Sequence, residues 1–215
     1  MSDSSRILRE DDPEHAVLLA QGWTVTHRSW GARLVLAGDA DLGPMVEAAA
    51  AAQAAGYELR RLVGTDMIAL RSLDEQVAPD FPDTPASHHD PVPTDLGTRL
   101  DDGSSLGFVA VDTEGEMVAY TWMDRLPDRW EVDRTGVAAA HRRRGLARAV
   151  KAASILATYA LGARCWGTGG AGVNTASLTM NRSLGFVLEP QWHTLAPPGY
   201  PEAPLSARAA GGRPQ

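Results

Sequence analysis

The residues best suited to bind a ligand form one short turn at residues 141–147, with the sequence His-Arg-Arg-Arg-Gly-Leu-Ala. An apolar helical pattern starts directly after the glycine. Backbone N–H groups at the start of a helix have no partner within the helix, and the helix dipole adds positive charge there. Gly145 lets an anion approach closely, Ala147 keeps the first helical turn narrow, and the arginines add charge-assisted hydrogen bonds. We therefore predict a phosphate-binding turn; a solvated basic loop is the alternative.

Two carboxylates precede this turn in a segment that has the pattern of a strand, residues 130–137. Glu131 and Asp133 are two residues apart, and side chains at that spacing point to the same face of a regular strand. Such a pair could take a proton from an amine or bind the amine in its cationic form. Charged side chains at the edge of a sheet are the alternative.

The histidines and the cysteine give weaker signals. His88 and His89 lack a carboxylate or a third histidine at ligand spacing, so we expect a polar loop and no metal site. Cys165 is the only cysteine, which excludes an internal disulfide and a cysteine-rich zinc site. It stands in a short apolar segment without an obvious base, so we expect a buried structural cysteine rather than a catalytic nucleophile.

Composition and charge limit the class of protein. With 215 residues, 44% of them apolar and 22% charged, the chain can bury a sizeable core. A formal net charge of -7 does not favour a nucleic-acid partner, because the positive charge gathers only locally, over residues 142–151. A basic nucleic-acid module is the alternative, and it predicts strongly salt-dependent DNA binding. The N-terminal residues do not resemble a signal peptide and no apolar run approaches the roughly 20 residues of a membrane span, so we expect a cytoplasmic protein with no membrane partner.

Hydrophobic periodicity predicts the elements that must position these residues. We expect helices over residues 15–21, 41–55, 65–77, 145–161 and 175–183, the last with Asn174 as its N-cap. We expect strands over residues 23–26, 33–37, 57–63, 106–111, 117–123, 130–137, 164–166 and 186–195, the first two joined by a turn at 29–31. Residues 78–97 contain five prolines and are expected to form a binding loop or lid. Residues 1–13 are expected to be frayed or disordered.

Three segments resemble the GCN5-related N-acetyltransferase (GNAT) superfamily. Residues 142–147 are similar to its Gln/Arg-x-x-Gly-x-Gly/Ala motif, and residues 135–137 precede them at the spacing of its central strand. Residues 181–186, Asn-Arg-Ser-Leu-Gly-Phe, look like its terminal "N…LGF" segment. The resemblance covers residues 57–195. It implies an α/β fold, the GNAT fold, in which a mixed, mostly antiparallel sheet splays open beside the central strand and is flanked by helices.

The resemblance also implies acetyl-CoA as cosubstrate. Pantetheine would lie in the split of the sheet, pyrophosphate would bind the backbone at the turn, and Asn174 would bond near the pantetheine or the adenosine end. The backbone N–H of Val137 is implied as the donor to the thioester carbonyl. The implied cofactor-binding residues are Thr135, Gly136, Val137, Arg142, Arg143, Arg144, Gly145, Leu146, Ala147, Arg148 and Asn174.

The catalytic residues implied by the resemblance are Glu131, Asp133 and Asn181. Glu131 falls at the position of the catalytic glutamate of the histone-acetylating branch. Many relatives carry a tyrosine acid where this chain has Asn181, which cannot donate a proton but could hydrogen-bond the sulfur or position a water; Thr135 is another hydroxyl within reach of the split. We expect an N-acetyltransferase that moves acetyl directly to the primary amine of a small molecule or peptide. A non-catalytic acyl-CoA-binding sensor is the alternative, favoured by the missing tyrosine.

The N-terminal part echoes the C-terminal part. In residues 18–25, as in residues 181–188, the end of a helix runs through Gly-aromatic into a strand. Some members of the superfamily, such as mycothiol synthase-like proteins, carry two modules in tandem, so residues 1–55 resemble the tail of a truncated first module. Its strands would dock on the acetyltransferase domain, residues 56–196, or on another subunit of a homodimer, and residues 197–215 would form a mobile tail. Chance similarity of short helix–strand units is the alternative.

Overall fold

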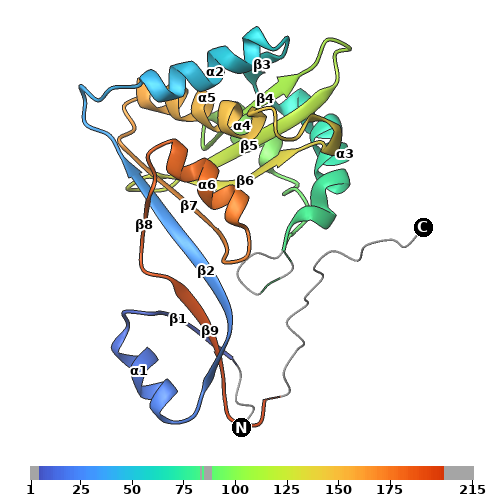
Figure 1. The fold of residues 1–215 in the computed structure, drawn as a ribbon. Helices are drawn as coiled ribbons and strands as arrows, with labels where there is room; N and C mark the ends of the chain where they lie inside the picture. Colours follow the sequence, from blue (N-terminus) through green and yellow to red (C-terminus); the bar gives the residue numbers. More distant parts are fainter. Residues whose placement is uncertain (1–4, 83, 85–88, 201–215) are drawn as a thin grey trace.

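The computed structural model describes residues 5–82, 84 and 89–200, and within them nine strands form one sheet with the order β1-β9-β2-β7-β6-β5-β4-β3, while β8 also pairs with β2 (Figure 1). All strand pairs are antiparallel except β6 and β7, which are parallel. The strands are β1 (Arg6–Arg9), β2 (Thr24–Val35), β3 (Glu58–Arg61), β4 (Ser105–Val111), β5 (Met117–Arg125), β6 (Trp130–Val137), β7 (Cys165–Ala171), β8 (Val187–Leu188) and β9 (Trp192–Ala196). The expected mixed, mostly antiparallel sheet is therefore confirmed.

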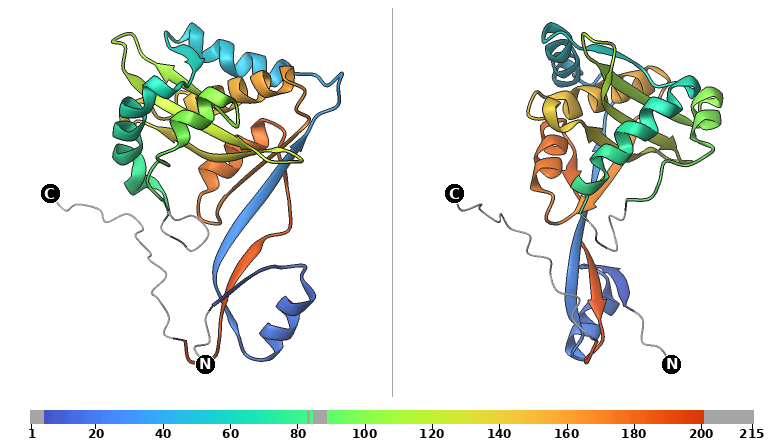
Figure 2. Two further views of the ribbon diagram at one scale, coloured as in Figure 1. Left: turned by 180° about the vertical axis from the view of Figure 1, so that it is seen from behind. Right: turned by 90° about the vertical axis from the view of Figure 1, so that its right-hand side faces the viewer.

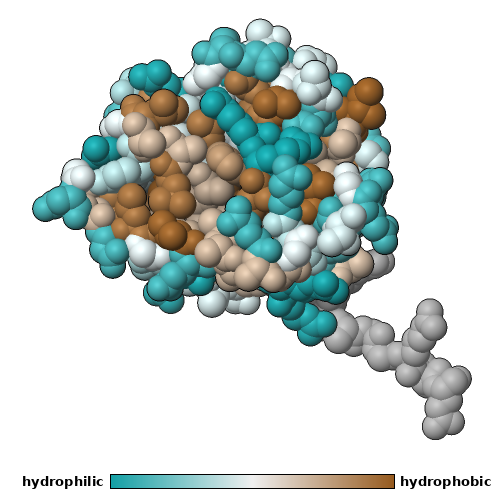
Figure 3. All heavy atoms as spheres, turned by 90° about the horizontal axis from the view of Figure 1, so that it is seen from above, coloured by the Kyte–Doolittle hydropathy of each residue, from teal (hydrophilic) through white to brown (hydrophobic). Residues whose placement is uncertain are grey.

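Helices cover both faces of this sheet (Figure 2). The helices are α1 (Pro13–Ala20), α2 (Gly43–Ala54), α3 (Met67–Val77), α4 (Leu96–Asp102), α5 (Leu146–Ala160) and α6 (Thr175–Ser183), with the short 3-10 turns η1 (Gly64–Asp66), η2 (Ala78–Asp80) and η3 (Ala139–His141). α3 and α4 bury their leucines against Tyr120 and Trp122 of β5 on one face. α2 and α5 pack on the other face, where Met45 and Ile155 belong to one apolar cluster. Apolar and polar side chains share the outer surface over these two helices (Figure 3).

α5 is the helix that carries the predicted phosphate-binding turn at its start. Its apolar residues recur every three or four positions, and Leu146, Val150 and Ile155 are fully or almost fully buried. Full burial of one such side chain contributes about 1.5–3 kcal/mol. This packing ties the helix firmly to the sheet, so that its N-terminus has a defined position beside the ends of β5 and β6.

β2 corrects the prediction of two short strands separated by a turn. It is one strand of 12 residues, and Ser29, Trp30 and Gly31 pair in register with β7. Trp30 is buried, and its ring N–H donates to the carbonyl of Ala171 at 3.1 Å. Pairing with neighbouring strands and the burial of Trp30 therefore override the turn preference of a serine–glycine segment.

The first half of β2 pairs with β9, and the two strands extend away from the rest of the protein as a narrow arm (Figures 1 and 2). α1 and β1 lie at its far end. β1 pairs with β9, which corrects the prediction of frayed structure for residues 6–9, while residues 1–4 lie outside the described residues. Pro13 starts α1 and the Asp12 side chain accepts a hydrogen bond from the backbone N–H of Glu14, so the local sequence also favours this helix.

The bounds of several other elements differ from the predicted ones. β7 continues to Ala171, beyond the expected end at 166, because β2 pairs along its whole length. Residues 78–97, expected to lack regular structure, include η2 and the start of α4. The expected last strand is divided into β8 and β9 on either side of Pro190. Part of the expected tail, residues 201–215, lies outside the described residues. In the described part of the chain no helix is both long enough and apolar enough to cross a membrane.

Candidate active site

β6 and β7 diverge soon after they meet. They pair only at Trp130 with Trp166 and at Glu131 with Gly167, although both strands continue for several more residues. The ladder is therefore lost from Val132 onward, and the two strands open a wedge in the sheet. The splayed sheet expected from the sequence has its opening here.

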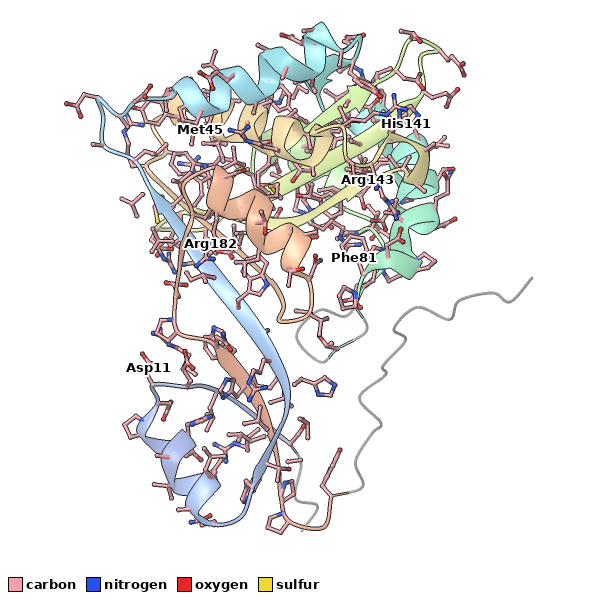
Figure 4. All side chains as sticks on the ribbon, viewed as in Figure 1. Asp11, Met45, Phe81, His141, Arg143 and Arg182 are labelled. Atoms are coloured by element: carbon pink, nitrogen blue, oxygen red, sulfur yellow. The ribbon has the colours of Figure 1, made fainter. Side chains whose placement is uncertain are left out.

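The turn into α5 has an unusual backbone. Arg143 has a φ of 59°, the one positive φ among the described non-glycine residues, and Gly145 has a φ of 79°. A left-handed conformation costs an L-residue about 1–2 kcal/mol, and such strain is concentrated at ligand sites. No side chain caps the start of α5. The turn therefore leaves the first backbone N–H groups of α5 available to an anion. Figure 4 shows His141 and Arg143 on this turn.

A cavity of about 740 Å³ lies over the turn, and every predicted cofactor residue except Arg144 lines it. Arg144 instead donates to the hydroxyl of Tyr57 at 3.1 Å, and that hydroxyl is 3.0 Å from Nδ1 of His141. Arg144 thus braces the turn from outside the cavity. Asn174 lines the cavity and is the predicted N-cap of α6, since its Oδ1 accepts from the N–H of Ser177 at 3.1 Å.

The charges over this cavity are not all positive. Arg142 donates to Asp80 of η2 through both terminal nitrogens, one of them at 3.1 Å, and its Nε donates to the carbonyl of Val137 at 3.2 Å. Arg148 donates to the carbonyl of Pro44 at 3.2 Å. Asp80 is therefore a carboxylate inside a basic cavity, and it competes with any anion for Arg142.

A larger cavity of about 880 Å³ adjoins the first and reaches through the wedge to β2 and β7. The two cavities share six lining residues, namely Phe81, Thr135, Ala147, Asn174, Ala176 and Met180. The larger cavity also has polar walls, and these include Glu131, Asp133, Lys151 and Thr168. The two adjoining cavities, together called the hollow, extend from the arginine turn to walls that contain carboxylates.

The side chain of Glu131, on β6, lies against Gly167 of β7 at the start of the wedge. Its Oε2 accepts from Nε of Arg129 at 2.6 Å. A Cβ atom at position 167 would lie 2.0 Å from the same oxygen, so the carboxylate occupies space that only glycine leaves open. Gly167 is thus required for the observed position of Glu131.

Asp133 does not follow the regular alternation of side chains that was expected for this strand. Val132 pairs with Met123 and Arg134 pairs with Trp122, so Asp133 is an extra residue in a β-bulge. The bulge interrupts the two-residue period, yet Asp133 still lines the larger cavity together with Glu131. Burial raises the pKa of Asp133, while Arg134, whose Nε donates to it at 3.0 Å, opposes the rise.

Asn181 does not reach either cavity. Its side chain is buried, with Oδ1 accepting from Nζ of Lys151 at 2.7 Å and Nδ2 donating to the carbonyl of Ser177 at 2.9 Å. Lys151, which Asn181 holds, lines the larger cavity instead, and sequence reasoning treated this lysine only as part of a basic cluster. Two signals were available: Lys151 is the only lysine of the chain, and it stands one helical turn after Ala147. Burial lowers the pKa of Lys151 to about 7.

A second polar cluster was also missed. Asp74 of α3 is buried and accepts from the hydroxyl of Tyr120 and from the guanidinium of Arg134 at 3.3 Å, while Nε2 of His89 lies 3.0 Å from it. Arg134 also packs over the ring of Trp122. The cluster joins residues 89–90 to β6, and it turns Tyr120 away from both cavities. Burial and the bond to Asp74 raise the pKa of Tyr120 well above its usual range.

The remaining candidates are placed as follows. Within the described residues no three His, Cys, Asp or Glu side chains gather as metal ligands, and His88 lies outside that part of the chain. Cys165 is half-buried rather than buried, with Arg33 donating to its Sγ at 3.8 Å. The hydroxyl of Tyr159 donates to the carbonyls of Ala37 and Gly38, and Tyr159 lines neither of the two cavities. Thr135 lines both cavities, and its hydroxyl lies 2.8 Å from that of Thr121.

Comparisons with known proteins agree with this geometry. Residues 70–186 match the family model described as "Acetyltransferase (GNAT) family". No curated protein matches the sequence.

Solved structures share the fold. A GCN5-related N-acetyltransferase from Sphaerobacter thermophilus superposes with a TM-score of 0.63 at 16% identity, covering 91% of this chain and 60% of that one. A GCN5-related N-acetyltransferase from Kribbella flavida gives 0.57 at 18% identity, covering 91% and 68%. A tandem GNAT protein from the clavulanic acid biosynthesis pathway gives 0.56 at 14% identity, covering 89% and 62%. The chain thus spans about 60% of the length of the first of these structures.

Proposed function

Because this chain belongs to the acetyltransferase (GNAT) family, we propose that it transfers an acetyl group from acetyl-CoA directly to the primary amine of a small molecule or peptide. The observation that carries the proposal is the hollow, whose two adjoining cavities lie between the arginine turn and the carboxylates. A phosphate site at one end and proton-accepting groups at the other suit a reaction between a phosphorylated donor and an amine.

The residues present fit the proposed cosubstrate. The strained turn at Arg143 and Gly145 would hold the pyrophosphate through the backbone N–H groups of α5. The guanidinium groups of Arg142, Arg143 and Arg148 would add charge-assisted hydrogen bonds. Cavities of about 740 Å³ and about 880 Å³ lie within the range of ordinary ligand sites, and the wedge between β6 and β7 would take the pantetheine arm.

The chemistry we propose begins with the amine in the larger cavity. Glu131 or Asp133 would attract the ammonium form and take a proton from it, which leaves a neutral nitrogen with a lone pair. A raised pKa makes Asp133 a better base near neutral pH than an ordinary carboxylate. The nitrogen would form a bond to the carbonyl carbon while the carbon–sulfur bond breaks and sulfur leaves with the electron pair. The nitrogen would then lose its second proton to the carboxylate, which has released the first proton to solvent. The backbone N–H of Val137 would stabilise the charge on the carbonyl oxygen.

The test measures free thiol release from acetyl-CoA in the presence of a panel of primary amines. We expect turnover with at least one amine, and a fall of about 10²-fold or more for the double variant Glu131→Gln with Asp133→Asn. Glu114→Gln, in the exposed turn between β4 and β5, is the matched control and should keep full activity. Tight binding of acetyl-CoA without turnover on any amine would instead support the acyl-CoA sensor and refute the transferase.

We also infer that residues 1–55 derive from the tail of a truncated first module joined to an acetyltransferase domain at residues 56–196. Two observations support this division. β2 completes the sheet by pairing with β7, β8 and β9, as a docked terminal strand would. The structural likeness extends to a tandem protein of which this chain covers 62%.

A further inference from the structure

Lys151 is a buried amine that has no ion-pair partner among the described residues. It is 2% exposed, and no described carboxylate forms an ion pair with it. Nζ donates to Oδ1 of Asn181 at 2.7 Å and to Oγ1 of Thr168 at 3.4 Å, and lies 5.8 Å from the ring centre of Phe186. An ammonium group has three N–H donors, so one is left without a described protein acceptor. Burying such a cation is costly, and an apolar side chain would pack here at lower cost.

The position of Lys151 connects the two parts of the hollow. Ala147, one helical turn earlier on the same face of α5, lines both cavities. Thr168 follows directly after Gly167, the last residue of β7 that pairs with β6. The lysine therefore reaches from α5 to β7 at the point where the wedge opens, and its side chain lines the larger cavity there.

We propose that the ammonium group of Lys151 is the proton donor to the thiolate that leaves during acyl transfer; this inference rests on the proposed function. As the carbon–sulfur bond breaks, sulfur keeps the electron pair and takes one proton from Nζ. The products of this step are the free thiol and a neutral lysine. The acylated nitrogen, cationic once its new bond has formed, loses its second proton to Glu131, and this proton restores the ammonium form of Lys151. The negative charge of Glu131 is close enough to favour that form.

The positive charge of Lys151 suits it to act on the leaving sulfur rather than on the incoming amine. A buried cation attracts a departing thiolate and repels an amine that arrives as a cation, so Lys151 suits the sulfur and Glu131 suits the amine. Asn181 is a positioning residue, because its amide holds Nζ but has no proton to give at neutral pH. With a pKa of about 7, Lys151 has both forms populated near neutrality, as proton transfer requires.

The test exploits the fact that the chain has a single lysine. Protein labelled with ¹³C-lysine gives one side-chain titration curve, recorded for the free protein, with CoA, and with desulfo-CoA, which lacks the thiol. We expect CoA to raise the pKa of Lys151 by about 1–3 units above the value with desulfo-CoA, because a bound thiolate stabilises the ammonium form. The thiolate itself should appear in the ultraviolet spectrum of bound CoA at a pH where free CoA remains a thiol.

A variant adds a kinetic measurement. Lys151→Met should lose the thiolate absorbance and lower kcat by about 10²–10⁴-fold, with little change in KM for acetyl-CoA. Arg182→Met, which removes an exposed cation on α6, is the control and should keep both. A merely structural lysine would not generate a thiolate.

The outcomes separate the two proposals. If calorimetry detects no binding of CoA to the unchanged protein, the proposed function fails. If CoA binds but neither shifts the titration of Lys151 relative to desulfo-CoA nor ionises, the proton-donor role is refuted while the proposed function stands. The titration uses the unchanged protein, so it gives a decision even if Lys151→Met does not fold.

Discussion

Replacing Lys151 with methionine should stabilise the protein at neutral pH, because the change removes a buried group that is costly to ionise. Burial lowers the pKa of Lys151 from 10.5 to about 7. Each unit corresponds to about 1.4 kcal/mol, so the full penalty is about 5 kcal/mol below the folded pKa and about 4 kcal/mol at pH 7, where half of the folded molecules are neutral. The variant leaves Oδ1 of Asn181 without its donor, which costs about 1–3 kcal/mol. The net gain expected at pH 7 is therefore about 1–3 kcal/mol.

The stability gained by Lys151→Met must shrink as the pH rises. Between the folded pKa of about 7 and the unfolded value of 10.5, the unfolded chain binds a proton on Lys151 that the folded chain has released. The free energy of unfolding of the unchanged protein therefore increases by about 1.4 kcal/mol per pH unit in this window. Below the folded pKa both states hold the proton, and the penalty is complete and constant. Near the upper end of the window, Lys151→Met should be no more stable than the unchanged protein.

Denaturant unfolding followed by tryptophan fluorescence, repeated between about pH 6 and about pH 9.5, measures this difference. Arg182→Met is the control for replacing a cation with methionine on the surface, and it should change stability by less than about 0.5 kcal/mol at every pH. A variant that is no more stable at pH 7, or a difference that does not narrow at higher pH, would show that Lys151 is not a desolvated amine in the folded protein.

Three further substitutions test other parts of the site. Gly145→Ala meets no atom within 4 Å but must adopt a φ of 79°, so the melting temperature should fall by the equivalent of about 1–2 kcal/mol, and less for Gly145→Asn; equal losses would contradict the backbone argument. Gly167→Ala pushes the carboxylate of Glu131 aside, so amine acetylation should drop while CoA affinity measured by calorimetry stays the same; retained turnover would exclude a role for that carboxylate position. Asp80→Asn frees Arg142 and removes a negative charge from the cavity over the turn. CoA should therefore bind several-fold tighter at low salt, and the gain in affinity should fade at high salt. Weaker binding would contradict the proposal that this cavity binds the phosphates.

Several elements were predictable because their signals lie in consecutive residues. The strand at Trp130–Val137 and the helix at Thr175–Ser183 have the predicted bounds, and Asn174 caps that helix as expected. The arginine turn was found in the same way, since a basic segment, a glycine and an apolar helical period stand side by side. Side-chain periodicity, capping and turn preference are local properties, and local properties can be read along the chain.

Pairing between strands changed two of these local conclusions. Ser29 and Gly31 favour a turn, yet they remain extended because β7 and β9 supply partners on both sides of β2. Asp133 was expected to share a strand face with Glu131, but the register of β5 inserts a bulge at that residue. In both places the partner strand comes from a distant part of the chain, and no pattern within the segment records it.

The succession of most helices and strands along the chain, and the prediction of an anion-binding turn, follow from the sequence by itself. The distribution of charge inside the hollow follows only from the tertiary structure. Lys151 meets Asn181 and Thr168 across 30 and 17 residues of chain, and the Asp74 cluster joins four separated segments. The reason is physical: a pKa depends on burial and on neighbouring charges, and both are decided when distant segments pack together. Along the chain Lys151 is one more basic residue after the arginine turn; in the folded protein it is a buried amine at the opening of the wedge.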